Sequence, residues 1–206
     1  MARDTHSIVK MSRREGYALH PKAHKALVKR TTLPGQQNGG RGRGPKASQY
    51  SLQLREKQKV KRLYGLLEKQ FSNLMKEATR KEGQSGEVLL QLLERRADNV
   101  IYRAGFAPSR RAARQLVTHG HFMLNGRRVD IPSIRLRPGD ELIVRGKSAE
   151  SQYFKKLDDV SPAPSITPQW LKVNRKKQSV SVAALPVRDD AEPDINEQLI
   201  VEYYSR

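Results

Sequence analysis

The 206-residue sequence has no cysteine, one tryptophan and an aromatic fraction of only 6%. The lack of cysteine excludes disulfide bonds, thiolate zinc sites and cysteine catalysis, and it fits a reducing compartment. The sequence contains no run of about 18 apolar residues, so we expect no membrane span and no membrane partner. The few aromatic residues include no pair typical of sheets that stack RNA bases, which argues against that mode of RNA binding.

Acidic residues are also scarce, with 21 Asp and Glu against 40 Lys and Arg, a net charge of +19 and a pI near 10.4. Residues 1–50 hold 11 Lys and Arg against 2 acids, whereas residues 151–206 hold eight of each. Such an excess predicts a polyanion as partner, bound through its phosphates with strong salt dependence. Because residues 151–206 carry no net charge, we expect them to pack on protein and not on the polyanion.

Patterns for catalysis and metal binding are missing as well. The five histidines are scattered, and no Walker loop, nucleophile elbow or dinucleotide fingerprint is present. KMSRR (Lys10–Arg14) and RRAD (Arg95–Asp98) resemble short motifs of tRNA-charging and RNA-modifying enzymes, but no catalytic domain accompanies either. We therefore expect no enzyme activity, cofactor, metal or small-molecule substrate. Asp98 is expected to cap a helix or to pair with nearby arginines.

Along the first half of the chain, local sequence patterns predict one irregular segment followed by helices. Leu33–Ser48 is too rich in Gly and Pro for regular structure, and its Arg41, Arg43 and Lys46 suggest a strip along phosphates, with a plain linker as the alternative. Apolar residues from Val60 to Ala78 recur every three or four positions, which predicts one long helix. A second helix is expected after Ser85. A third, over Asn99–Phe106, should end near Gly105.

The segment from Ser109 predicts a further helix, with Ser109 as its N-cap. Its apolar residues (Ala112, Ala113, Leu116, Val117) lie on one arc and its arginines (Arg110, Arg111, Arg114) on the other. Arg110 and Arg114 repel each other by about 0.2–0.5 kcal/mol at this spacing. The unbound protein gains nothing visible from that pair, so the arginine arc is expected to face RNA.

Strands are predicted after Gly120. Asn125-Gly126 is typical of a tight hairpin turn, with Arg127 and Arg128 following it. Four further stretches predict strands: Ile134–Leu136, Leu142–Val144, Trp170–Val173 and Ser179–Val187. Residues 194–205 are too apolar for a disordered tail and predict a turn followed by a strand or a helix.

Several motifs occur in the order found in one known family. They are SRREG (Ser12–Gly16), PGQ (Pro34–Gln36), QLREKQKVKRLYG (Gln53–Gly65), ERRADNVIYRAGF (Glu94–Phe106), SRRAARQLV…NGRRVDIPS (Ser109–Ser133) and DINEQLIVEYYS (Asp194–Ser205). Over nearly its whole length the chain resembles the S-four family of bacterial small-subunit ribosomal proteins. Some members carry N-terminal cysteines for zinc, and this chain has none, so zinc is not carried over.

The patterns and the resemblance predict an α+β fold with a mostly helical N-terminal domain, a small RNA-binding module and a strand-rich C-terminal extension. The module is expected to be a short helix pair on an antiparallel sheet. The predicted segments are a basic, Gly/Pro-containing arm (1–48), a helical domain (49–93), the S-four-type RNA-binding module (94–160) and an extension packing on the other domains (161–206).

The resemblance implies a primary 16S rRNA-binding protein that nucleates assembly of the 5′ domain and contributes to translational accuracy. Its implied partners are 16S rRNA, the neighbouring small-subunit protein S-five and mRNA near the entry channel, in the cytoplasm of a bacterial-type cell. Expected rRNA-binding residues are Ser12, Arg13, Arg14, Arg41, Arg43, Lys46, Gln53, Arg55, Lys57, Lys59, Arg62, Arg110, Arg111, Arg114, Asn125, Arg127 and Arg128. The expected interface with the protein partner is Ile200, Glu202, Tyr203 and Tyr204.

Two alternatives are weighed against this reading. An RNA-modifying or tRNA-charging enzyme could carry the same module, and the missing catalytic domain argues against it. A free-standing RNA chaperone or translational repressor is disfavoured by the neutral, apolar tail, which indicates a fixed protein partner.

Overall fold

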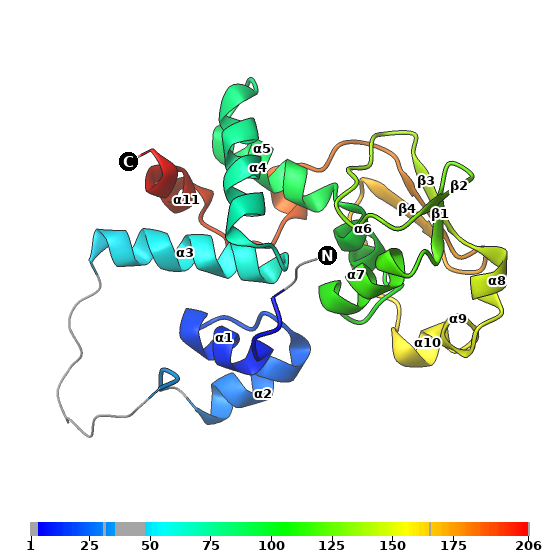
Figure 1. Ribbon diagram of the computed structural model, residues 1–206, viewed down its shortest axis with the longest axis horizontal. Coiled ribbons are helices and arrows are strands. Elements are labelled where there is room, and N and C mark those ends of the chain that lie inside the picture. The colour runs from blue at the N-terminus through cyan, green and yellow to red at the C-terminus, as the bar shows by residue number, and fades with distance from the viewer. Residues whose placement is uncertain (1–3, 31, 36–47, 165, 206) are drawn as a thin grey trace. The chain divides into compact units, whose positions relative to one another are not determined.

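The computed structural model describes residues 4–30, 32–35, 48–164 and 166–205 (Figure 1). It divides into two compact units, which we describe separately. The first consists of Met1–Gly86 with Asp194–Arg206, and the second of Glu87–Pro193. The first unit is thus discontinuous in sequence, because the end of the chain returns to it. The division into four segments expected from the sequence (1–48, 49–93, 94–160 and 161–206) remains a prediction.

The first unit begins with two helices that the sequence analysis did not predict, α1 (Ile8–Glu15) and α2 (Pro21–Lys29). They pack on each other, and α1 also packs on α3 (Gln49–Leu63) (Figure 1). Their buried apolar residues are few, chiefly Met11 and Ala23. So small an apolar face leaves a weak periodic signal in a segment dominated by charge.

The prediction of one long helix over Val60–Ala78 is wrong. The helix α3 ends at Leu63, and a separate helix α4 begins at Glu68 and ends at Arg80. Gly65 between them has φ +66°, a left-handed conformation that glycine adopts without a steric penalty. The apolar spacing continues across the break because Tyr64 and Leu66 are buried as well.

The C-terminal segment forms a helix, α11 (Glu197–Tyr204), which settles the choice that the sequence left open. Asn196 caps it by accepting a hydrogen bond from the Leu199 amide. The helix packs against α3 with Ile200 fully buried. Gly86 lies against the start of this helix, since a Cβ atom there would be 2.7 Å from Cγ of Glu197.

Helices α5 (Ser85–Glu94), α6 (Ala97–Arg103) and α7 (Arg110–Thr118) match three of the predicted helices. The first of them starts at the boundary of the two units. Gly105 has φ +76° just after α6, and Gly120 has φ +70° just after α7, as expected for helix ends. Ser109 caps α7, because its Oγ accepts a hydrogen bond from the Ala112 amide at 3.2 Å.

The second unit contains a five-stranded antiparallel sheet in the order β2-β1-β3-β5-β4 (Figure 1). The strands are β1 (Phe122–Leu124), β2 (Arg127–Val129), β3 (Glu141–Val144), β4 (Leu171–Asn174) and β5 (Ser179–Val182). The predicted hairpin is confirmed, with φ +47° at Asn125 and +82° at Gly126. Ile134–Leu136 is not a strand, because it makes only an isolated bridge from Arg135 to Arg96.

The core of the second unit joins helices α6 and α7 to the sheet. Phe106, Val117, Phe122, Leu142 and Trp170 are among its buried residues. Four short helices complete the unit: α8 (Gly146–Ala149), α9 (Gln152–Lys155), α10 (Leu157–Val160) and η1 (Arg188–Asp190). The predicted α+β class is confirmed. The strands of the extension belong to the same sheet as those of the module.

Candidate nucleic-acid interface

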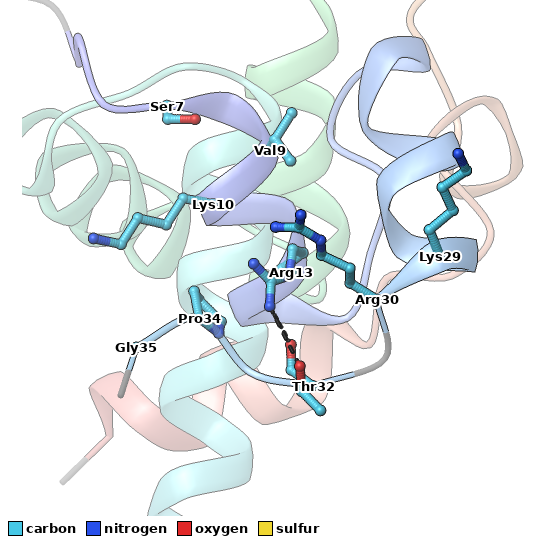
Figure 2. Close-up of a pocket in the computed structure, with 9 residues that line it drawn as sticks. All are labelled: Ser7, Val9, Lys10, Arg13, Lys29, Arg30, Thr32, Pro34 and Gly35. Carbon is cyan, nitrogen blue, oxygen red and sulfur yellow. Dashed lines mark hydrogen bonds between the residues drawn. The ribbon is translucent and has the colours of Figure 1, made fainter. Parts of the chain in front are cut away.

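The three expected RNA contacts on α1 differ in accessibility. Ser12 is fully buried, where its hydroxyl donates a hydrogen bond to the Ile8 carbonyl and accepts one from the Leu19 amide. Arg13 donates from Nη2 to the Thr32 carbonyl at 2.8 Å (Figure 2). Arg14 is exposed. Ser12 therefore ties α1 to the segment that follows it, whereas Arg13 is half-buried and Arg14 is accessible to solvent.

Two of the expected contacts on α3 are buried by the C-terminal helix. Gln53 donates from its amide to Glu202 at 2.7 Å. Lys57 is only 3% exposed, donates to Glu68 at 2.7 Å, and has its ammonium 4.5 Å from the centre of the Tyr203 ring. A buried ammonium must have such partners, because it has lost its water. These two side chains act within the protein.

The other cations of α3 also have partners in the first unit. Arg55 and Arg62 both donate to Oε1 of Glu15, the former at 3.2 Å. Lys59 donates to the Asp194 carbonyl at 2.6 Å and pairs with Glu56. Burial raises the pKa of Glu15, and its arginine partners only partly oppose that shift. The basic run on α3 is thus largely an internal network and not a solvated face.

In the second unit the arginines of α7 belong to an ion-pair network. Arg110 donates from Nε to the Asn99 side chain at 2.8 Å and from Nη2 to Glu192 at 3.0 Å. Arg114 donates to Asp98 at 3.3 Å, and Arg96 forms two hydrogen bonds to the same carboxylate at 2.7 and 3.0 Å. The expectation that Asp98 pairs with nearby arginines is confirmed.

This network corrects the expectation that the unbound protein gains nothing from Arg110 and Arg114. Their side chains are 10% and 16% exposed, and each compensates a carboxylate inside the protein. Burial alone would raise the pKa of Glu192, yet Arg110 and Arg103 together lower it. Arg111 is the exposed arginine of α7. The helix therefore directs two of its three arginines to protein acids.

The hairpin turn is clamped to a second turn. Asn125 donates from Nδ2 to Asp140 at 2.8 Å, and its Oδ1 accepts a hydrogen bond from the Glu141 amide at 2.9 Å. Asn125 thus has a structural function, and it connects the hairpin to the turn that carries Arg137. Arg137 was not predicted as a binding residue from the sequence. We call Arg127, Arg128 and Arg137 the turn cluster, after the two clamped turns that carry them; all three are exposed, and none forms an ion pair with a carboxylate of the described residues.

The two hairpin arginines are expected on opposite faces of the sheet, and one of them lies against the residue that follows α7. Arg127 pairs with Leu124 and Arg128 with Met123, and successive strand residues point to opposite faces. The Arg128 guanidinium lies over Gly120, where an added Cβ would be 2.3 Å from its Nε. Gly120 follows the C-terminal end of α7, whereas Arg110 begins the helix. The Cα atoms of Gly120 and Arg110 are therefore separated by on the order of 15 Å along the helix axis.

The expected protein interface is partly used within the chain. Ile200 is fully buried, so the prediction that it contacts another protein is wrong for this conformation. Tyr204 donates a hydrogen bond to Glu68 at 3.1 Å, and burial raises its pKa. Glu202 is exposed although it accepts a hydrogen bond from Gln53, and Tyr203 is half-buried.

Three expected contacts, Arg41, Arg43 and Lys46, lie outside the described residues. In the part of the chain that the structure describes, no cluster of His, Cys, Asp or Glu could hold a metal ion. Among the same residues no helix is both long and apolar enough to cross a membrane.

An open pocket in the first unit is lined by Arg13 and by three cations that were not predicted from the sequence, Lys10, Lys29 and Arg30 (Figure 2). The signal that could have found them is the near absence of acidic residues from the first 50 positions. Without carboxylates nearby, cations of this segment have few internal partners.

Comparison with known proteins accounts for almost the whole chain. Residues 3–94 match the ribosomal protein S4/S9 N-terminal domain, and residues 95–142 match the S4 domain. Small ribosomal subunit protein uS4 of Chlorobaculum tepidum is 49% identical over 207 residues, and uS4 of Clostridioides difficile is 50% identical over 212 residues. In both cases 100% of each chain is covered. With half of its residues identical over the full length, this chain belongs to the uS4 family of small ribosomal subunit proteins, which are ribosomal proteins and not enzymes.

Proposed function

We propose that this chain is a primary 16S rRNA-binding protein of the small ribosomal subunit, which binds the 5′ domain early and nucleates its assembly. The observation that carries the proposal is the full-length match to uS4 proteins, which includes both units. The turn cluster supports phosphate contact in the second unit, because its exposed arginines are available to a polyanion. Exposed Arg14 supports contact in the first unit.

The rRNA-binding test uses the full chain and a 16S 5′-domain transcript with no other protein present. A primary binder needs no earlier protein, so we expect tight binding that weakens steeply as salt rises. A transcript of equal length from the 3′ domain is the matched control. Equal affinity for the two transcripts, or an affinity that does not change with salt, would contradict the proposal.

The proposal includes a protein neighbour, S-five, at the exposed part of α11. The balanced charge of residues 151–206 supports a protein contact over an RNA contact there. Because the chain has no cysteine, Glu202→Cys creates a unique attachment point for a crosslinker. In reconstituted small subunits we expect a crosslink to S-five. A product containing only rRNA would argue against this interface.

The remaining parts of the proposal concern location and decoding. We expect the chain to sediment with small subunits when a bacterial lysate is run on a gradient, and sedimentation only at the top of the gradient would contradict this.

A contribution to accuracy near the mRNA entry channel predicts that Glu202→Lys changes the misreading of a near-cognate reporter codon. An unchanged reporter, in cells where the variant is assembled into subunits, would remove accuracy from the proposed function.

A further inference from the structure

The turn between β1 and β2 contains a chemically labile pair of residues, Asn125-Gly126. Asparagine is among the less durable side chains, because its amide carbon can be attacked by the backbone nitrogen of the next residue. Glycine in that next position has no side chain to obstruct the attack, and a Cβ atom added at Gly126 would meet nothing within 4 Å. Both residues are exposed, so water reaches them. The turn therefore has the composition and the accessibility that deamidation requires.

Three hydrogen bonds hold Asn125 against the turn that precedes β3. Its backbone amide donates to the Glu141 carbonyl at 3.0 Å, and its Oδ1 accepts from the Glu141 amide at 2.9 Å. Its Nδ2 donates to Oδ1 of Asp140 at 2.8 Å. The other carboxylate oxygen of Asp140 accepts from the Arg137 amide at 2.7 Å, which fixes the carboxylate in turn. The side-chain amide of Asn125 is thus bound at both of its polar atoms.

These bonds oppose deamidation. The reaction requires the Gly126 nitrogen and Cγ of Asn125 to approach with their orbitals aligned, and then to reach bonding distance. As Cγ moves toward the nitrogen and becomes tetrahedral, it carries Oδ1 and Nδ2 away from their present partners. The bonds to Asp140 and to the Glu141 amide must therefore break before the reaction can proceed. The clamp makes a labile pair durable while the protein is folded.

We propose that Asn125 is a deamidation site of this protein and that the clamp by Asp140 sets its rate. In the reaction the Gly126 nitrogen gives its proton to solvent and forms a bond to Cγ of Asn125. The bond from Cγ to Nδ2 breaks, and the nitrogen takes up a proton and leaves as ammonia. Water then opens the resulting cyclic imide at either carbonyl, which gives aspartate or isoaspartate. Water is consumed, ammonia is released, and nothing is oxidised or reduced.

Either product would change the surface that carries the turn cluster. Aspartate places a carboxylate oxygen where Nδ2 of Asn125 now lies, 2.8 Å from Oδ1 of Asp140, and two carboxylates so close repel each other. Isoaspartate adds a carbon atom to the main chain of a tight hairpin turn, whose length sets the register of the strands. Both products add negative charge beside three arginines. The expected loss of RNA affinity rests on the proposed function, whereas the deamidation itself does not.

The test follows deamidation of the full chain by peptide mapping with mass spectrometry, in buffer and in guanidinium chloride. Denaturant removes the clamp, so we expect Asn125 to react roughly tenfold more slowly in buffer, the fold-change of hydrogen bonds of ordinary strength. The chain contains one other Asn-Gly pair, Asn38-Gly39, which lies outside the described residues and serves as an internal standard in denaturant. If Asn38 reacts there and Asn125 does not, the proposal is overturned.

Two variants assign the protection to the clamp. In buffer, Asp140→Ala should deamidate at Asn125 several-fold faster than wild type. Glu141→Ala is the matched control, because it removes a neighbouring exposed acid and keeps the backbone groups that bind Asn125. In denaturant all three proteins should react at the same rate. Equal rates for the three proteins in buffer, or equal wild-type rates in buffer and denaturant, would overturn the proposal; the second comparison needs no variant.

Transcript binding separates this proposal from the proposed function. Asn125→Asp should bind the 5′-domain transcript more weakly than wild type and with a smaller salt slope, because its new charge opposes the turn cluster. Binding equal to that of wild type would overturn the expected consequence of deamidation. A wild-type chain with no affinity for the transcript would overturn the proposed function, while the deamidation rates would still decide whether Asn125 is a modification site.

Discussion

Asp98 provides the sharpest test of the ion-pair network in the second unit. Its carboxylate is 4% exposed and accepts two hydrogen bonds from Arg96, which is itself 5% exposed, and one from Arg114. Asp98→Asn keeps the shape but removes the negative charge and turns an amide N–H toward guanidinium donors. Two arginines then lose their counter-ion inside the protein.

Removing one partner of a buried ion pair typically costs about 3–5 kcal/mol, because the remaining charge is buried and unpaired. Since the amide oxygen of the variant still accepts one hydrogen bond, we expect about 3 kcal/mol of destabilisation here. Arg114→Gln should cost less, because Arg96 still pairs with Asp98 and Arg114 is the more exposed arginine.

The assay is urea unfolding followed by the fluorescence of Trp170. This is the only tryptophan of the chain, and it is buried in the core of the second unit, so its signal reports that unit. Asp130→Asn is the matched control, because Asp130 is exposed in the same unit. A loss below about 1 kcal/mol for Asp98→Asn, or a loss equal to that of Asp130→Asn, would refute the reasoning, since surface substitutions stay within about 0.5 kcal/mol.

Three further predictions concern the other interactions. Ile200→Ala should destabilise the first unit by about 2–5 kcal/mol, measured by hydrogen exchange on α3, whereas exposed Leu52→Ala should have little effect. Burial alone would raise the pKa of Glu68, but hydrogen bonds from two lysines lower it to about 2, so its contribution to stability is present above pH 4.5 and lost as pH falls toward 2. Glu68→Gln should flatten acid unfolding in that window, and an unchanged profile would contradict this. Arg127→Gln/Arg128→Gln should lower the salt slope of rRNA binding by up to about 1.8 without changing the thermal midpoint.

Local chemistry explains which parts of the fold could be predicted. Ser109 caps a helix with its own hydroxyl, and Asn125-Gly126 forms a turn because those two residues tolerate positive φ. Such features depend on neighbours within a few positions, so the sequence reveals them directly. The break at Gly65 was missed because apolar residues on both sides of it are buried with the same spacing.

The candidate site could not be predicted in the same way. Glu192 pairs with Arg110 from 82 positions away, and Glu15 pairs with Arg62 from 47 positions away. Residues of α11 bury Lys57 and Gln53, although the motif that contains them reads as an exposed basic run. No local pattern in the sequence indicates partners that are so distant along the chain.

The sequence by itself determined the family, through motifs that occur in the family's order. It also determined the large positive charge, which predicts a polyanion as the binding partner. The tertiary structure alone decided which of those charges are still available to bind one. Arg110, Arg114 and Lys57 are held by acids of the same chain, while Lys10, Arg30 and the turn cluster are exposed. The physical reason is that an ion pair requires its two atoms within about 4 Å, and only folding brings residues so distant in sequence to that separation.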